Sequence, residues 1–501
     1  MKFLVGYSED SSSDQRVKAG LTLLQENVQA VKKVVSVIET TLGPKGLDVM
    51  LVDSEGNPTV TNAGATILSR MEVDHPVSRM LIKVAESQQK RIGDGTTTAT
   101  LLAASIVEEG AKQILRGIPV VKVIAGIQQG IALAVKKMKE NAYAVQGLED
   151  DWLHRIAYTA SRGYEDITLS VMDAVQMIGE QQLEQRDYRL SDCIVTHPNA
   201  EGIVFSGILV KRTRLHPQMP VLKEKTKVFV ISDSVTPSKT DGEWKKDFLQ
   251  DLEKLDQLKV GAVFVAGEVH PLAEEFFIEK GIFAVDQVTK ADLGRLAEHT
   301  NAKLTRFAVL SKDTHEMMER LGECEEVEDD NLLNWVRVTG GAGRQTATIL
   351  IGASTEEVIE ERERICRDVA SAVQAAVKGG FVPGGGAIEL AIARDLELYA
   401  DKLPGLERYG VSAVVEALYR PISQVVTNAG YNSLEKLELV KRAQQAKQIR
   451  SLGFDCDRGH VADMLEAGVV DPLLTKLNAL ATALEVSTAI LRIHTIIPTK
   501  N

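Results

Sequence analysis

A short glycine- and threonine-rich segment, Gly93-Asp94-Gly95-Thr96-Thr97-Thr98, stands where a loop is expected to become a helix. A helix N-terminus presents unpaired N–H groups and a partial positive charge, which together favour phosphate. Asp94 would be repelled by a phosphate unless a cation lay between them, and magnesium, a hard ion held by carboxylate and phosphate oxygens, is the natural choice. Taken alone, however, the segment favours a simpler interpretation, a glycine-rich turn with a threonine N-cap.

Two further glycine-rich turns strengthen the case for a phosphate ligand. One is Thr41-Leu42-Gly43-Pro44-Lys45-Gly46, and the other is Gly384-Gly385-Gly386-Ala387. Three consecutive glycines are costly in chain entropy, so a close approach of the backbone to a ligand is one explanation, and a flexible hinge between domains is the other. The sequence contains no GxxxxGK[ST] motif, so a nucleotide site here would not be of the P-loop type.

Two carboxylates are candidates for catalysis or binding. Asp368 stands between the heavily charged stretch EEVIEERERICRD, which it ends, and the apolar stretch VASAVQAAV. At such a junction a carboxylate could be partly buried and could orient water, although an ordinary solvated helical aspartate is the alternative. Asp471 precedes Pro472, which is typical of a turn after a helix. The nine histidines include neither HExxH nor a Ser/His/Asp signature, which argues against a metalloprotease or a serine hydrolase.

The elements around these residues are mainly helical at both ends of the chain. Apolar residues from Leu21 to Ile38 follow a three-four spacing, which predicts a helix that Gly43-Pro44 ends. LDVMLVD and TVTNA predict a hairpin, and further helices are predicted from Pro76 to about Lys90 and from Thr96 to Leu115. From Ser354 to about Ile493 the pattern is helical again.

The middle of the chain differs in pattern. Between about Lys227 and Ala353, short apolar segments alternate with helical stretches, and we expect strands at VFVIS, VGAVFVAG, GIFAVDQV, FAVLS and TATILIGA. This alternation predicts an α/β domain with a substantially parallel sheet. The sequence therefore predicts an α/β domain inserted into a helical one.

Length, net charge and composition exclude several classes of protein. A chain of 501 residues is too long for one hydrophobic core. Its net charge of −12 argues against nucleic-acid binding. The four cysteines are scattered, which indicates reduced thiols and not a zinc site. No apolar run approaches bilayer length and no signal peptide is evident, so we expect a cytoplasmic protein without membrane association.

Several segments, in their order along the chain, resemble the chaperonin family from about Gly20 to Ile497. They are TLGPKG, TVTNAGATIL, HPVSRML, GDGTTTATLL, VPGGGAIE and GVVDP…ILRI. HPVSRML and VKRTRLHPQMP are closer to the archaeal and eukaryotic cytosolic branch, which has a built-in lid. The spacing from Asp368 to Gly384 is closer to the bacterial branch, and this mixture resembles the bacterial group III chaperonins.

The resemblance implies a multidomain fold. A mainly α-helical, split equatorial ATPase domain would comprise residues 1–141 and 387–501. A small, split α/β intermediate domain would comprise residues 142–203 and 353–386, and an inserted α/β apical domain residues 204–352. Such subunits would form a homo-oligomeric double ring, eight-fold by resemblance, whose chamber closes with ATP and encloses non-native client proteins.

The resemblance also assigns roles to residues. ATP with Mg²⁺ would be the ligand, with Asp94 as the metal ligand and Asp368 as the catalytic residue that positions the attacking water. The nucleotide-binding residues would be Thr41, Leu42, Gly43, Pro44, Asp94, Gly95, Thr96, Thr97, Thr98, Gly385, Asp455 and Asp471. Of these, Gly385 and Asp471 would contact the nucleoside, and Asp455 would lie near the base.

Two departures from the family pattern affect the expected function. The family usually has Asp-Gly where this chain has Ala63-Gly64, so hydrolysis would be slow or would depend more on Asp368. Only a short segment separates Pro237 from Val260, so a built-in lid would be abbreviated. The competing functions are a passive holdase, which Ala63 keeps open, and a monomeric or dimeric ATP-dependent enzyme that binds a small-molecule substrate in its α/β domain.

Overall fold

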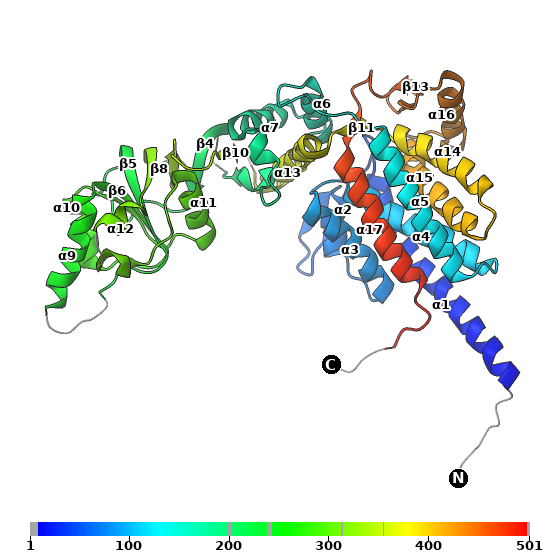
Figure 1. The fold of residues 1–501 in the computed structure, drawn as a ribbon, viewed down its shortest axis with the longest axis horizontal. Coiled ribbons are helices and arrows are strands. Elements are labelled where there is room, and N and C mark those ends of the chain that lie inside the picture. The colour runs from blue at the N-terminus through cyan, green and yellow to red at the C-terminus, as the bar shows by residue number, and fades with distance from the viewer. Residues whose placement is uncertain are drawn as a thin grey trace, which may run out of the picture. The chain divides into compact units, whose positions relative to one another are not determined.

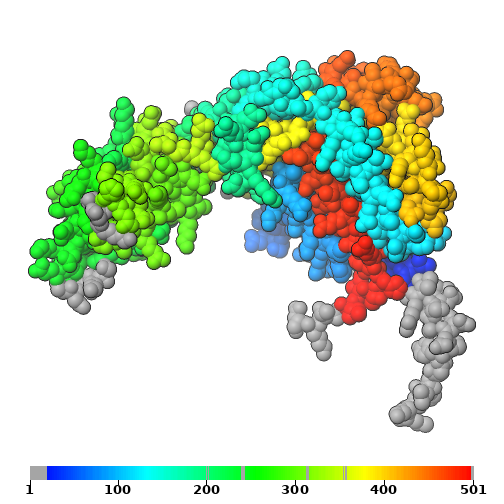
Figure 2. Space-filling model, viewed as in Figure 1, coloured from blue at the N-terminus to red at the C-terminus, as the bar shows by residue number. Residues whose placement is uncertain are grey.

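The computed structural model describes residues 9–198, 200, 202–237, 243–311, 314–353 and 355–497. They group into two compact units, one combining the residues up to Tyr164 with those from Asp368 onward, and the other spanning Glu165–Arg367. Figure 2 shows the first unit built from both ends of the chain, blue to cyan and yellow to red. The chain thus returns to its first unit after the second, as the sequence pattern predicts for an insertion. The division into three domains stays a prediction.

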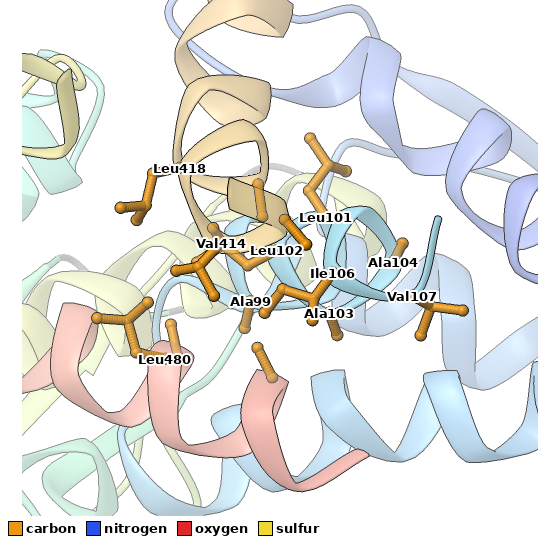
Figure 3. Close-up of a cluster of buried hydrophobic side chains, with 14 of the residues drawn as sticks. Ala99, Leu101, Leu102, Ala103, Ala104, Ile106, Val107, Val414, Leu418 and Leu480 are labelled. Atoms are coloured by element: carbon orange, nitrogen blue, oxygen red, sulfur yellow. The ribbon is translucent and has the colours of Figure 1, made fainter. Parts of the chain in front are cut away.

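The first unit is mainly helical and is centred on helix α4 (Thr96–Leu115). Helices α3, α5, α15 and α17 and the end of α1 pack around α4, and α17 runs beside α4 and α5 in Figure 1. Because α4 is surrounded, its residues from Ala99 to Val107 are all buried, whereas a surface helix would bury one stripe. Figure 3 shows Leu101, Leu102 and Ile106 of α4 packed with residues of α15 and α17.

The remaining bounds in this unit follow the prediction closely at the N-terminal end and less closely at the C-terminal end. The predicted hairpin and the helix from Pro76 are confirmed, but the predicted all-helical C-terminal region also contains short strands. The elements are α1 (Glu9–Ile38), η1 (Glu39–Thr41), β1 (Val49–Val52), β2 (Pro58–Thr61), α2 (Gly64–Arg70), α3 (Pro76–Arg91), α5 (Val120–Glu140), α6 (Asp151–Ala160), β11 (Phe381–Pro383), α14 (Ala387–Lys402), α15 (Glu407–Asn428), α16 (Ser433–Lys447), β12 (Leu452–Asp455), β13 (His460–Asp463), β14 (Val470–Pro472) and α17 (Leu473–Leu491); α13 (Glu356–Gly379) has residues in both units.

The second unit is built on an eight-stranded sheet with the order β3-β10-β4-β9-β8-β5-β6-β7. Strands β5, β6 and β7 are parallel, as are β3 and β10, whereas the other neighbours are antiparallel. The elements are α7 (Glu165–Ile178), α8 (Glu180–Leu183), η2 (Leu190–Cys193), β3 (Ile194–Thr196), β4 (Ile203–Val210), β5 (Leu222–Ile231), α9 (Trp244–Gln257), β6 (Val260–Val265), α10 (Pro271–Glu279), β7 (Phe283–Val285), α11 (Lys290–Thr300), η3 (Phe307–Ser311), α12 (Thr314–Met318), β8 (Gly322–Asp330), β9 (Trp335–Thr339) and β10 (Ala347–Ile351).

The alternation of side chains along β5 and β6 explains the helices on both faces of the sheet. Phe229 and Ile231 of β5 belong to a core cluster with α9 and α10. Val228 and Val230 belong to a second cluster, with α11. Successive side chains of a strand point to opposite faces, so a strand that is apolar at every position requires cover on both sides.

Two predictions for this unit are wrong. The sheet is mixed and not substantially parallel, because β4, β8 and β9 enter it antiparallel. Strand β8 was not predicted, because its acidic sequence GECEEVEDD contains few apolar residues. In the structure its buried residues alternate with more exposed ones. The segment FAVLS, expected as a strand, is the 3₁₀ helix η3.

A buried histidine gives this unit a pH-dependent stability. His299 is 2% exposed, and its Nε2 accepts the Gly341 N–H at 3.1 Å while its Nδ1 lies 2.9 Å from Thr346 Oγ1. Burial disfavours the charged form and lowers the pKa of His299 below its usual 6.5. The unfolded chain therefore binds more protons below that pH, and the stability that neutral His299 contributes is lost as the pH falls through this range.

We expect acidification from pH 7.5 to 5.5 to speed amide hydrogen exchange around Gly341 more in the wild type than in His299→Asn, which cannot titrate. The comparison of the two proteins removes the intrinsic pH dependence of exchange and the contribution of all other groups. Equal pH dependence in both proteins would show that His299 is not the titrating group.

Within the part of the chain that the structure describes, no helix is both long enough and apolar enough to cross a membrane.

Candidate functional site

The turn before α4 has an open helix N-terminus. Gly93 and Gly95 have φ values of +89° and +76°, and Gly95 is the N-cap residue without any side-chain cap. The amide groups of the first turn, Thr96–Thr98, therefore have no side-chain cap and remain available to an anion. The simpler interpretation, a threonine N-cap, is wrong, because the cap position belongs to a glycine.

Hydrogen bonds from residues of α3 and α17 hold this turn in place. Gln88, which is fully buried, donates from Nε2 to the Asp94 carbonyl at 2.8 Å and to the Thr475 carbonyl at 3.2 Å. Its Oε1 accepts from Asn478 Nδ2 at 2.6 Å. A Cβ added at Gly95 would lie 2.6 Å from Thr475 Cγ2, so a glycine is required on packing grounds as well as by its positive φ.

The second glycine-rich turn is held beside α4. Thr41 ends η1, which packs against both α4 and α15, and Leu42–Pro44 follow it. Asn428 of α15 donates from Nδ2 to the carbonyls of Glu39 at 2.8 Å and Leu42 at 2.9 Å. The Thr41 hydroxyl donates to the Ile38 carbonyl at 2.8 Å, and Gly43 has φ +89°. The residues predicted for this turn therefore lie next to α4, the helix that begins at the Gly93–Thr98 turn.

The third glycine-rich turn lies between a short sheet and a helix. Strand β11 pairs with β14, with Val382 opposite Asp471, and the Gly384 N–H donates to the Val469 carbonyl at 2.9 Å. Gly386, at φ +77°, is the N-cap residue of α14 and again no side chain caps the helix. Asp471 was predicted in a turn, but it is the middle residue of β14. The register with β11 places Asp471 beside the glycines.

A buried lysine connects the carboxylates of this region. Lys476 Nζ lies 2.7 Å from Glu389 Oε1 and 2.8 Å from Asp471 Oδ2. Burial, followed by the charge of Asp471, raises the pKa of Asp94 to about 6. Asp94 and Asp471 are therefore close enough for their charges to interact, although they lie far apart in the sequence.

The donor set around Asp94 fits magnesium. Among the described residues no group of three His, Cys, Asp or Glu side chains could enclose a metal ion. Magnesium does not require such a cage, because it is commonly held by one or two carboxylates together with phosphate oxygens and water. A divalent cation would also offset the burial of the Asp94 charge and its proximity to Asp471, which in that order raise the pKa of Asp94.

Asp368 lies on the part of α13 that packs at the same turn. A Cβ added at Gly93 would lie 2.2 Å from Ser371 Oγ, so the α13 backbone passes directly beside the turn. Asp368 precedes Ser371 by three positions and so lies on the same side of the helix. It is half-buried, as expected for a carboxylate at the junction of charged and apolar sequence.

Asp455 has a local structural contact that its predicted role does not require. Its carboxylate Oδ1 accepts the N–H groups of Asp457 at 2.9 Å and Arg458 at 3.0 Å, which fixes the turn between β12 and β13. Lys45 forms an ion pair of 2.6 Å with Asp457, so this turn is connected to the Thr41–Gly46 turn. A contact of Asp455 with the base stays a prediction.

Ala63 lies next to the turn before α4. It is the N-cap residue of α2 and provides no side-chain cap. Gly64 beside it packs against Thr97, since an added Cβ would lie 2.3 Å from Thr97 Oγ1. A carboxylate at position 63 would therefore stand beside the N-terminus of α4.

The resemblance implies ATP hydrolysis, and on that expectation Ala63→Asp should raise steady-state ATP turnover by about tenfold, because a carboxylate here could hold water or a cation near bound phosphates. The matched control is Ala63→Asn, because asparagine caps α2 as well as aspartate does but carries no charge. Such a cap stabilises a helix by about 1 kcal/mol in either variant. Equal turnover in the two variants would show that the missing carboxylate does not limit hydrolysis.

The sequence patterns did not reveal four supporting residues: Gln88, Glu389, Asn428 and Lys476. All four lie within helices, where a polar side chain is normally expected to face solvent. Lys476 had a usable signal, because it is the one charged residue in the segment Pro472–Leu484. A lone charge in an apolar helix is seldom buried without a partner.

Known proteins resemble this chain over nearly its whole length. A family model described as the TCP-1/cpn60 chaperonin family matches residues 34–501. The thermosome subunit of Methanopyrus kandleri is 32% identical, over 94% of this chain and 91% of the relative. The thermosome subunit alpha of Thermoplasma acidophilum is 32% identical, over 96% and 92%. A crystal structure of a group III chaperonin in the open state matches with a TM-score of 0.88 and 36% identity, over 96% of this chain and all of that one. The chain belongs to the TCP-1/cpn60 chaperonin family.

Proposed function

We propose that this chain is the subunit of an ATP-driven chaperonin, in which a double ring encloses non-native proteins and promotes their folding. One observation carries the proposal. In a chain that matches the chaperonin family over residues 34–501, one glycine-rich turn forms the uncapped N-terminus of α4 and a second follows η1, which packs on α4. The third follows β11, which pairs with β14 at Asp471. An uncapped helix N-terminus is suited to the phosphates of a nucleotide.

The proposed ligand is ATP with Mg²⁺, where the cation would neutralise charge that develops on the phosphates. The amides and hydroxyls of Thr96, Thr97 and Thr98 would bind phosphate, and Asp94 would bind the cation. Thr41, Leu42, Gly43 and Pro44 would line the pocket, while Gly385 and Asp471 would contact the nucleoside. The half-buried carboxylate of Asp368 would accept a proton from, and so orient, the water that attacks the terminal phosphate.

The proposed assembly is a homo-oligomeric double ring with eight subunits in each ring, located in the cytoplasm. Within each subunit we propose three domains with the boundaries predicted from the sequence. The abbreviated lid concerns residues 237–260, of which 238–242 lie outside the described residues. A client is a protein with exposed apolar surface, because burial of apolar surface is the general driving force of association in water.

The proposal is tested by refolding. A chemically denatured enzyme is mixed with the purified full-length assembly, and its activity is followed after addition of ATP with Mg²⁺, of ADP with Mg²⁺, or of neither. We expect recovery of activity with ATP above the spontaneous yield, and no such recovery with ADP. Capture of the client without ATP-dependent release would identify a passive holdase. No interaction with the client in any condition would favour a small-molecule enzyme.

A further inference from the structure

A buried lysine in the first turn of α17 has no role among those proposed above. The side chain of Lys476 is 14% exposed and bridges Glu389 of α14, at 2.7 Å, and Asp471 of β14, at 2.8 Å. The Glu389 side chain is 6% exposed and that of Asp471 33%. The lysine therefore connects one enclosed carboxylate with one that is open to solvent.

The charges explain why this lysine keeps its proton. Burial acts to lower the pKa of Lys476, but the charges of Asp471 and Glu389 outweigh burial and raise it. A buried charge persists only when it is paired, so the three side chains depend on each other. Removal of the lysine would leave Glu389 without compensation and Asp471 free to rotate.

The same turn of α17 also supports the phosphate side of the site. Thr475, the neighbour of Lys476, contacts Gly95 and accepts a hydrogen bond from Gln88, which also binds the Asp94 carbonyl. The backbone at Lys476 is thus fixed relative to the turn before α4. The Lys476 side chain extends from this position to Asp471. It therefore connects the turn before α4 with the strand that carries Asp471.

Among the residues that the structure describes, only one carboxylate oxygen of Asp471 has a partner. Oδ2 accepts from Lys476, whereas Oδ1 has no hydrogen-bond partner within the described part of the chain. A carboxylate with one oxygen held and the other exposed is arranged to accept a hydrogen bond from outside the protein. Ribose hydroxyls are donors that aspartate and glutamate bind in nucleotide sites generally.

We propose that Lys476 is a positioning residue of the nucleotide site: it holds Oδ2 of Asp471 so that Oδ1 accepts hydrogen bonds from the ribose hydroxyls. The inference rests on the proposed contact between Asp471 and the nucleoside. Its physical basis is preorganisation, because a side chain that is already held in the binding orientation loses no rotational freedom when the ligand arrives.

The test compares ADP with 2′,3′-dideoxy-ADP, which lacks both ribose hydroxyls. Affinities of each nucleotide with Mg²⁺ are measured by calorimetry on the full-length assembly for the wild type, Asp471→Asn, Lys476→Met and the double variant. We expect Lys476→Met to weaken ADP binding by about tenfold and dideoxy-ADP binding by less than about twofold. In the Asp471→Asn background, the lysine substitution should change neither affinity, since both act on one contact.

Controls separate positioning from folding. Glu389→Gln retains the pair between Lys476 and Asp471 and should keep the preference for ADP. If Lys476→Met does not assemble, Glu389→Leu/Lys476→Met removes both buried charges together, which proteins commonly tolerate, and is measured in its place.

Three results would overturn the inference. Equal loss of affinity for the two nucleotides in Lys476→Met would show a merely structural role. An unchanged preference for ADP in Lys476→Met, with a lost preference in Asp471→Asn, would overturn the positioning role alone. An unchanged preference in Asp471→Asn would overturn the nucleoside contact in the proposed function as well.

Discussion

Asp368→Ala should lower the rate of ATP hydrolysis by about 10²–10⁴-fold, the range that a positioned general base contributes. The affinity for ADP with Mg²⁺ should change by less than about twofold, because the proposed role of Asp368 concerns the attacking water and not the bound nucleotide. The physical reason is the place of Asp368 on α13, one turn before the residue that contacts Gly93. Turnover is measured under saturating ATP and affinity by calorimetry.

A matched control lies on the same helix. Glu360 is exposed, two turns before Asp368, and Glu360→Ala should leave turnover within about twofold of the wild type. Asp368→Asn keeps the shape of the side chain but cannot accept a proton, so it should resemble Asp368→Ala. Wild-type turnover in Asp368→Ala would refute the assigned mechanism.

Asp94→Asn should abolish the dependence of ATP binding on Mg²⁺. Wild-type affinity for ATP should rise at least about tenfold when Mg²⁺ is added, whereas the variant should show no such increase, because a neutral amide is a poor ligand for a hard cation. The measurement is ATP affinity with Mg²⁺ or with a chelator. A full Mg²⁺ effect in Asp94→Asn would show that another group binds the cation.

The pH dependence gives an independent check on the same residue. Burial and the charge of Asp471 raise the pKa of Asp94 to about 6, and the cation binds only the ionised carboxylate. Apparent Mg²⁺ affinity in the wild type should therefore be constant above pH 7 and should fall below pH 6, by up to about tenfold per unit. This fall should be absent from Asp94→Asn.

The same raised pKa has a consequence for stability without nucleotide. The folded protein binds a proton at Asp94 more readily than the unfolded chain, so stability falls as the pH rises from the usual 3.8 towards 6. At neutral pH, Asp94→Asn should therefore unfold at a higher temperature than the wild type while it binds Mg²⁺ less well. Stabilisation together with lost function is typical of a site whose charges are arranged for a ligand.

The sequence predicted the local elements well where a single pattern was sufficient. The helix from Thr96 to Leu115 and the hairpin were recognisable because their apolar spacing and turn residues agree. The acidic strand β8 was not, because it contains few apolar residues. The strand at Asp471 was not, because its formation depends on β11, which is remote in the sequence. FAVLS had the composition of a strand but became a 3₁₀ helix, which shows the weakness of short apolar runs as evidence.

The candidate site was predictable in its glycines and only partly in its polar residues. Glycine-rich turns are visible in any sequence, and their order along the chain made the resemblance specific. Lys476 and Gln88 both contact residues that are remote in the sequence. Gln88 and Thr475, for example, are 387 positions apart, a distance over which no sequence periodicity extends. Such pairings become apparent only when the fold brings α3, α14 and α17 to the same place.

The central claim, an ATP-driven folding chamber, is tested most directly by native mass. Light scattering after size exclusion is carried out on the full chain with and without ATP and Mg²⁺. We expect a particle of many 54.6 kDa subunits, consistent with two stacked rings. A monomer or dimer under both conditions would contradict it, because no isolated subunit can enclose another protein.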